Sequence, residues 1–348
     1  MKNKLILLAI FLFVLQGNQL FAQGCEGGDE PAKENTDAKS EEPKIKVFGF
    51  VQSQYDNYFY DTAENTFLFK RARIGVTGAV AKDFTYYVVL ETAPLLSSTG
   101  SAYLLDAFIT YHYSDWAKLS VGSFKQPFGA EVNTACNNLT TVERSMVSDQ
   151  IVAPQRDMGI MVLGGNNESK LKYSVALMNG RGLGVKDNNS KKDISGRLSY
   201  KAFDFLTVGG SFRYGYPTND DDDRTTYGFD ATAKYKNFKL VGEYIYDEGD
   251  YNRAAGGGCG VTPMELGAKR QGAYVMASYM TNFKLEPVFK YEFFDADLDL
   301  GSNLLEVMTF GANYHINKAT RLQLNYQYKV ESTEIDNDAL LVQLQVKF

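Results

Sequence analysis

Histidine and cysteine, the side chains that most often carry catalysis and bind transition metals, are scarce in this 348-residue sequence, which has two histidines and three cysteines. Neither His112 nor His315 has a serine or a carboxylate at the spacing of a known catalytic motif. The cysteines stand alone and far apart, unlike the clustered ligands of a zinc site. We therefore expect no enzyme, no metal site and no cofactor.

Long hydrophobic runs are also missing after residue 22, where no window of about 18 residues is free of charge, as a transmembrane helix would require. The first 22 residues differ, because Lys2 and Lys4 precede an apolar run over 5–15 and Ala22 precedes a plausible cleavage point. This pattern is typical of a secretory signal, so residues 1–22 are predicted to be a signal peptide. The exported chain is then either soluble or a β-barrel, whose membrane strands are only half apolar.

Large apolar side chains are almost missing from residues 23–44, which carry seven acidic residues and three lysines. Such a segment buries too little surface to offset its ordering entropy, so we expect a flexible periplasmic tail. An excess of basic residues is missing as well, because the whole chain has a formal net charge of −6. This acidic balance argues against nucleic acid as a partner.

The three cysteines are Cys25, Cys136 and Cys259, and an odd number leaves at least one outside any disulfide within the chain. Cys136 and Cys259 lie in two predicted long loops, and a disulfide between them is one interpretation. Cys25 lies in the predicted tail. It is either lipidated, although the residues before it match a lipoprotein cleavage box poorly, or an ordinary thiol.

What the sequence has in abundance is alternation, and the stretch RLQLNYQYKV over 321–330 is its clearest case. Leu322, Leu324 and Tyr326 point one way, while Arg321 and Gln323 point the other. A period of two predicts a β-strand. In a soluble sandwich the apolar row faces a core, whereas in an outer-membrane barrel it faces lipid and the polar row faces a wet interior.

From residue 45 onward the same alternation recurs in sixteen stretches with no helical periodicity between them. The predicted strands are 45–57, 66–80, 84–92, 103–113, 117–124, 157–164, 169–178, 192–201, 205–216, 225–235, 238–247, 271–280, 283–294, 304–315, 320–331 and 338–348.

The connections between these strands alternate strictly between tight turns and longer polar loops, which a soluble sandwich has no reason to do. Bacterial barrels show this asymmetry, with short turns in the periplasm and long loops outside. Aromatic residues gather near the strand ends, and the chain ends on Phe348. We therefore predict an all-β protein, a transmembrane antiparallel β-barrel of sixteen strands over 45–348, embedded in outer-membrane lipid. Sixteen strands leave an aqueous lumen, which we expect polar residues on every inward row to line.

The longest connection of the first half of the chain, 125–156, follows the fifth strand and carries both basic and acidic residues. Loops of this length are usually functional. We expect this loop to fold into the lumen and narrow it, where its charges would set ion selectivity.

Within and around this loop the sequence becomes familiar. The blocks VGSFKQPFGAE (121–131), VERS (142–145) and QRDMGI (155–160) resemble the phosphate-selective porin O and P family. KRARIGVTG (70–78), LLDAFITY (104–111) and TFGANYHINKATRLQLNYQY (309–328) fit the same pattern. The resemblance implies a sixteen-stranded, trimeric outer-membrane porin with a loop folded into its lumen. Members known for phosphate uptake carry arginines down the channel wall and a lysine cluster at the narrow point.

Onto that pattern we place candidate pore-lining cations from the polar rows of the strands and from the ends of the loop. They are Arg71, Arg73, Lys125, Arg144, Arg156, Arg197, Arg213 and Arg321. Glu131 and Glu143 are the acids of the constriction loop. The lysine cluster has no counterpart, because VNTACNNLTT after Glu131 contains no lysine. In the alternative interpretation Arg71 and Arg73 pair with Asp106 or Glu131 and hold the loop in place.

Two functions are compatible with a barrel of this kind. The first is passive diffusion of small hydrophilic solutes, biased toward inorganic or organic anions, phosphate among them, by arginine and lysine in the lumen. The alternative is a structural or adhesive barrel whose lumen is blocked by its own loop. The many charged inward rows favour the channel.

Overall fold

The computed structural model describes residues 45–59, 65–96, 100–251, 264–301, 303–331 and 336–348. The predicted signal peptide, the predicted tail, Cys25 and Cys259 lie outside these residues. No helix in the described part of the chain is long and apolar enough to cross a membrane.

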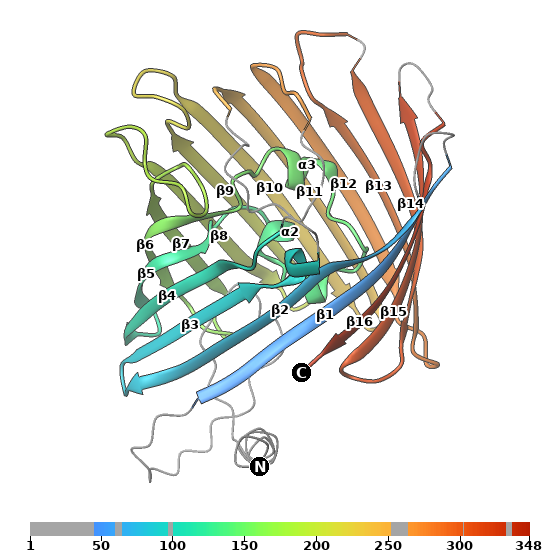
Figure 1. The fold of residues 1–348 in the computed structure, drawn as a ribbon, viewed down its shortest axis with the longest axis horizontal. Helices are drawn as coiled ribbons and strands as arrows, with labels where there is room; N and C mark the ends of the chain where they lie inside the picture. The colour runs from blue at the N-terminus through green and yellow to red at the C-terminus, as the bar shows by residue number, and fades with distance from the viewer. Residues whose placement is uncertain (1–44, 60–64, 97–99, 252–263, 302, 332–335) are drawn as a thin grey trace.

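Sixteen strands form one closed antiparallel barrel within the described residues, as the alternation predicts (Figure 1). Each strand pairs with its neighbours in the chain, and β1 closes the barrel by pairing with β16. The strands are β1 (Ile45–Tyr58), β2 (Thr66–Ala81), β3 (Phe84–Glu91), β4 (Tyr103–Ser114), β5 (Ala117–Lys125), β6 (Arg156–Gly164), β7 (Leu171–Met178), β8 (Asp193–Phe203), β9 (Leu206–Gly215), β10 (Arg224–Tyr235), β11 (Phe238–Gly249), β12 (Lys269–Tyr279), β13 (Leu285–Asp295), β14 (Leu304–His315), β15 (Thr320–Glu331) and β16 (Ala339–Lys347).

The two faces of β15 differ in exposure in step with the alternation of polar and apolar residues in the sequence. Arg321, Gln323 and Asn325 are at most 8% exposed, whereas Leu322 and Leu324 are at least 40% exposed. Polar side chains therefore point inward and apolar side chains outward, the inverse of a soluble protein. This arrangement is stable where the surrounding medium is lipid.

The inward rows of β3 to β7 carry polar side chains, among them Asp106, Thr110 and Ser120, together with an apolar cluster. Tyr87, Phe108, Phe124, Met161 and Met178 form a buried cluster there. Tyr87 stacks against Phe108 with ring centroids 5.2 Å apart. This apolar cluster fills part of the lumen beside the polar and charged side chains of the same strands.

The connection between β5 and β6 lies inside the barrel (Figure 1). We call residues 126–155 the inner segment. It contains two short α-helices, α2 (Ala130–Asn133) and α3 (Met146–Gln150), and the 3-10 turn η2 (Cys136–Asn138). A further 3-10 turn, η1 (Ala93–Leu96), follows β3.

Candidate channel site

The inner segment is fastened to the barrel wall through its backbone. Gly129 N–H donates to Ser211 Oγ at 2.9 Å, and the N–H groups of Ala130 and Glu131 each donate to the Glu243 carboxylate at 3.0 Å. Farther along the segment, Val142 N–H donates to Asn325 Oδ1 at 2.7 Å. Irregular backbone inside a barrel needs such partners, because its polar groups are costly to bury unpaired.

Apolar side chains fix the same segment against one side of the lumen. Phe128, Val132, Val147, Ile151 and Val152 pack on the inward faces of β11 to β13. Their partners on the wall are Val241, Ile245, Tyr274, Met276, Val288 and Phe294. Burial of this surface is not directional, and it holds the segment to β11–β13 in addition to the hydrogen bonds to Glu243.

Charged tethers hold the opposite edge of the segment and its far end. Glu143 forms an ion pair with Lys70 of β2 at 2.6 Å. Burial alone would raise the pKa of the Glu143 carboxyl, but the nearby Lys70 and Arg71 charges outweigh this and hold that pKa below its ordinary value. At the far end, Arg213 and Arg224 both donate to Ala153 O, at 3.0 and 2.8 Å.

Most of the arginines predicted from the sequence are held by wall carboxylates. Arg73 pairs with Glu91 at 2.7 Å, Arg156 with Asp106 at 3.0 Å and Arg213 with Asp193 at 2.6 Å. Arg197 donates to Asp230 at 2.9 Å. In the alternative interpretation Arg71 and Arg73 pair with Asp106 or Glu131. The register of the strands brings Asp106 to Arg156.

The other predicted residues also lie away from open water, with one exception. Arg71 donates to Gln52 Oε1 at 2.8 Å, and the Lys125 side chain is completely buried. Arg144 donates to Thr134 O at 2.8 Å. Arg321, on β15, reaches the cavity described below and donates to Asn137 O at 3.3 Å.

Glu131 and Cys136 also have structural partners, Glu131 within the inner segment and Cys136 on β2. The Glu131 carboxylate accepts from Ser145 N–H at 2.8 Å and from Ser145 Oγ at 2.6 Å, which closes the segment on itself. The buried Cys136 thiol accepts from Arg73 Nη1 at 3.3 Å. Because Cys259 lies outside the described residues, the disulfide between the two cysteines stays a prediction.

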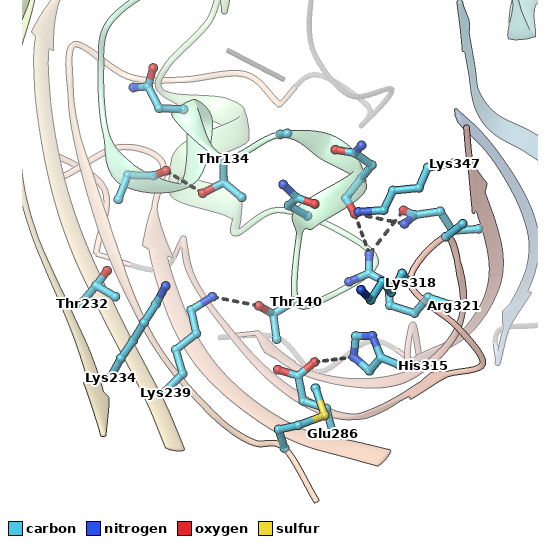
Figure 2. A pocket seen from close by; sticks show the side chains of 18 of the residues that line it. Thr134, Thr140, Thr232, Lys234, Lys239, Glu286, His315, Lys318, Arg321 and Lys347 are labelled. Carbon is cyan, nitrogen blue, oxygen red and sulfur yellow. Dashed lines mark hydrogen bonds and ion pairs between the residues drawn. The ribbon is translucent and has the colours of Figure 1, made fainter. Parts of the chain in front are cut away.

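A cavity of about 720 Å³ lies between the inner segment and the wall, at the end of the barrel that carries the tight turns (Figure 2). We call it the main cavity. Six basic side chains line it, against two carboxylates, so that four positive charges are in excess with histidine neutral. The basic residues are Arg197, Lys234, Lys239, Lys318, Arg321 and Lys347, and the acids are Asp230 and Glu286.

Both carboxylates of the main cavity already have partners of their own. Asp230 pairs with Arg197, and Glu286 lies 3.2 Å from the His315 ring nitrogen. Figure 2 shows the Glu286–His315 contact at the lower edge of the view. The positive charge of the cavity is therefore carried mainly by lysines.

Sequence reasoning missed these lysines because they lie beside the tight turns and look like ordinary turn residues. Lys234 and Lys239 flank the turn between β10 and β11, and Lys318 lies in the turn between β14 and β15. Two signals could have found Lys234 and Lys239. Both stand on the polar row of their strands, and both lie at the same end of the barrel.

Among the described residues, no group of three or more His, Cys, Asp or Glu side chains is placed to hold a metal ion. The geometry is that of a basic, water-accessible cavity beneath a fixed internal segment. Such an arrangement can attract anions.

The family model described as phosphate-selective porin O and P matches residues 45–233, which is more than half of the chain. The chain belongs to this family. The porin is 26% identical over 182 residues to Porin O of Pseudomonas aeruginosa. That match covers 49% of this chain and 41% of the relative, so it spans about two-fifths of the relative's length.

Solved structures with the same fold are outer-membrane proteins. An in-vitro folded trimer form of OmpT from Vibrio cholerae matches with a TM-score of 0.63 and 11% identity, covering 88% of this chain and 99% of that one. The anion-selective porin from Comamonas acidovorans matches with a TM-score of 0.63 and 13% identity, covering 88% and 100%. The porin is thus a β-barrel of the Gram-negative outer membrane.

Proposed function

We propose that this porin is a passive channel for small hydrophilic anions. The observation that carries the proposal is the main cavity, where six basic side chains face two carboxylates in a chain whose formal net charge is −6. Positive charge is concentrated where a solute would pass, although the molecule as a whole is acidic. A cavity of one sign inside a low-dielectric wall raises the local concentration of counter-ions.

Membership in a porin family and the barrel architecture favour a channel over an enzyme. Phosphate is the first anion to test, because the family description names it. The anion-selective porin of the same fold supports the coarser anion preference. The OmpT trimer form supports a homotrimer for this chain, which light scattering of the purified porin in detergent would test by mass.

The experiment is a current measurement in a planar bilayer across a KCl gradient. We expect a reversal potential displaced toward the chloride equilibrium potential and a reduced chloride current when phosphate is added. The double variant Lys234→Gln/Lys318→Gln should move the reversal potential toward zero. Lys82→Gln, in the exposed turn between β2 and β3, is the matched control and should leave it unchanged.

One observation favours a second candidate function, a structural or adhesive barrel without conductance. The inner segment contacts the wall on several sides, through Gln52 of β1, Glu243 of β11 and Asn325 of β15. The same bilayer measurement separates the two functions. Stable insertion without current above the leak of the bare bilayer would contradict the channel and support the blocked barrel.

A further inference from the structure

A second, smaller cavity borders the main cavity and has a different character. We call it the side chamber. Its volume is about 170 Å³, and it lies between the inner segment and strands β10 to β12. Lys234, Lys239 and Thr140 line both cavities, so the two adjoin at these residues. Leu139, Val241 and Met276 line the side chamber and do not line the main cavity.

Two lysines stand next to each other where the cavities meet. Lys234 and Lys239 are directly opposite in the antiparallel pairing of β10 with β11. Like charges in this position destabilise a sheet. Within the described residues neither lysine has a carboxylate at ion-pair distance, although Lys239 Nζ donates to Thr140 Oγ1 at 3.2 Å (Figure 2). Their placement is costly for stability and favourable for an anion that lies between two ammonium groups.

The interior of the side chamber offers mainly carbon. Several polar groups that line it have partners in the protein, because Glu131 accepts from Ser145 and Tyr274 Oη donates to Glu243 at 3.2 Å. Thr134 Oγ1 donates to Ala130 O at 3.0 Å. Leu139, Val241 and Met276 provide the apolar part of its wall, together with Ala130. An inorganic anion such as phosphate has no apolar surface to place there, whereas an organic anion does.

The volume limits the size of such a ligand. An apolar protein cavity of about 150 Å³ is large enough to hold benzene. The side chamber, at about 170 Å³, therefore has room for one six-membered ring.

We propose that the side chamber binds small organic monocarboxylates with an apolar body of about one ring. The carboxylate lies between Lys234 and Lys239, and the ring lies against Leu139, Val241 and Met276. This inference rests on the proposed anion channel, because the ligand reaches the chamber through the main cavity. It gives the porin a preference among organic anions of equal charge.

The first test compares sodium benzoate with sodium acetate as inhibitors of the chloride current in a planar bilayer. The two anions carry the same charge and differ in the ring. We expect benzoate to halve the current at a concentration at least tenfold below that of acetate. Equal inhibition by the two anions, in a channel that prefers chloride, would overturn the side chamber and leave the proposed function standing.

The second test fills the side chamber without changing any charge. Val241→Phe should abolish the preference for benzoate over acetate and retain the chloride selectivity. Leu240→Phe, next along β11 but 39% exposed on the outward face, is the matched control and should keep the preference. Leu139→Phe fills the chamber from the inner segment and replaces Val241→Phe if that variant does not fold. A benzoate preference that survives in the filled variant would refute the assignment.

A third measurement does not depend on conductance. Saturation-transfer NMR with sodium benzoate and the purified porin in detergent should give a signal that Val241→Phe removes and Leu240→Phe keeps. If the porin passes no current, this comparison still decides the binding site. A signal of equal strength in the wild type and in both variants would refute the binding site. Loss of the signal only in Val241→Phe would support it.

Discussion

Arginine and lysine have separate tasks at the level of single residues in this lumen. The arginines Arg73, Arg156 and Arg213 are buried against carboxylates, and Arg224 and Arg213 also hold a carbonyl of the inner segment. The planar guanidinium suits such fixed partners, because it forms several bonds in one geometry. Lysine keeps a compact charge on a flexible stem, which suits a cavity through which solutes move. In the proposed channel these arginines anchor the wall and the inner segment, and the lysines of the main cavity attract anions, whereas Lys70 is a lysine that anchors Glu143.

Gly129 of the inner segment has a backbone conformation that other residue types adopt only with strain. Its φ of 69° and ψ of 160° lie in a region essentially restricted to glycine, and a Cβ there would overlap Glu243 Oε1. We expect Gly129→Ala to cost about 1–3 kcal/mol locally and to displace α2 from its bonds to Glu243. Single-channel recording should show larger fluctuations of the open current. Gly242→Ala, whose Cβ would make ordinary contacts on the outward face of β11, should behave as the wild type.

The Glu143–Lys70 tether gives the inner segment a defined acid response. The folded pKa of Glu143 lies below its ordinary value of 4.5, so the pair stabilises the folded segment fully above pH 4.5 and loses this contribution as the pH falls through the lowered pKa. We expect the fluctuations of the open current to increase as the pH falls through this lowered pKa. Glu143→Gln should show them already at neutral pH. Glu168→Gln, in the exposed turn between β6 and β7, should respond to acid as the wild type does, and a wild type with no acid response would contradict the tether.

At the level of elements, the strands were predictable and the inner segment was not. Each predicted strand boundary lies within two residues of the observed one, because period-two alternation and tight turns are both local signals. The helices α2 and α3 have four and five residues, too few for a helical repeat to appear in the sequence. The predicted in-folding of 125–156 came from loop length and family resemblance, not from any such repeat.

Pairing between charged residues could not be predicted, because it depends on register between strands far apart in the sequence. Asp106 of β4 and Arg156 of β6 come together across β5, which lies between them in the barrel. The role of the lysines of the main cavity could not be predicted either, because it also depends on a part of the chain distant in sequence. Alternation indicates that Lys234 and Lys239 point inward, but only the position of the inner segment determines that they face a cavity.

The outward face of β15 and β16 permits a prediction about the membrane itself. Leu324 lies midway along β15 and is 45% exposed, whereas Val346 lies beside the tight turn at Thr320. A lysine at the middle of the bilayer costs about 2–4 kcal/mol, and near the interface about 0–1 kcal/mol. Leu324→Lys should therefore lower the free energy of unfolding in lipid vesicles, measured by denaturant titration, and Val346→Lys should leave it nearly unchanged. Equal losses of unfolding free energy in Leu324→Lys and Val346→Lys would contradict the placement of Leu324 at the middle of the bilayer and of Val346 near the interface.

At the level of the whole molecule, one acidic loop and the basic main cavity lie at opposite ends of the barrel. The acidic loop between β9 and β10 contains Asp220, Asp221 and Asp222, and Lys234 lies at the other end of β10. A strand of 12 residues spans on the order of 35–40 Å. Charge screening acts over about 10 Å in 0.1 M salt and about 3 Å in 1 M salt. The acidic loop is thus too distant to affect an ion in the main cavity at ordinary ionic strength.

This separation predicts how ion selectivity depends on salt. The triple variant Asp220→Asn/Asp221→Asn/Asp222→Asn should leave the reversal potential unchanged in KCl gradients between about 0.1 and 1 M, because the charges that select lie in the main cavity. The same triple variant should increase the preference for chloride only near about 0.01 M salt, where screening extends over about 30 Å. Lys234→Gln/Lys318→Gln should weaken the preference at every salt concentration, since a permeating ion passes within a few ångströms of these side chains. A reversal potential that follows the acidic loop at high salt, and not the lysines, would place the selective charges at the extracellular mouth and contradict the role of the main cavity.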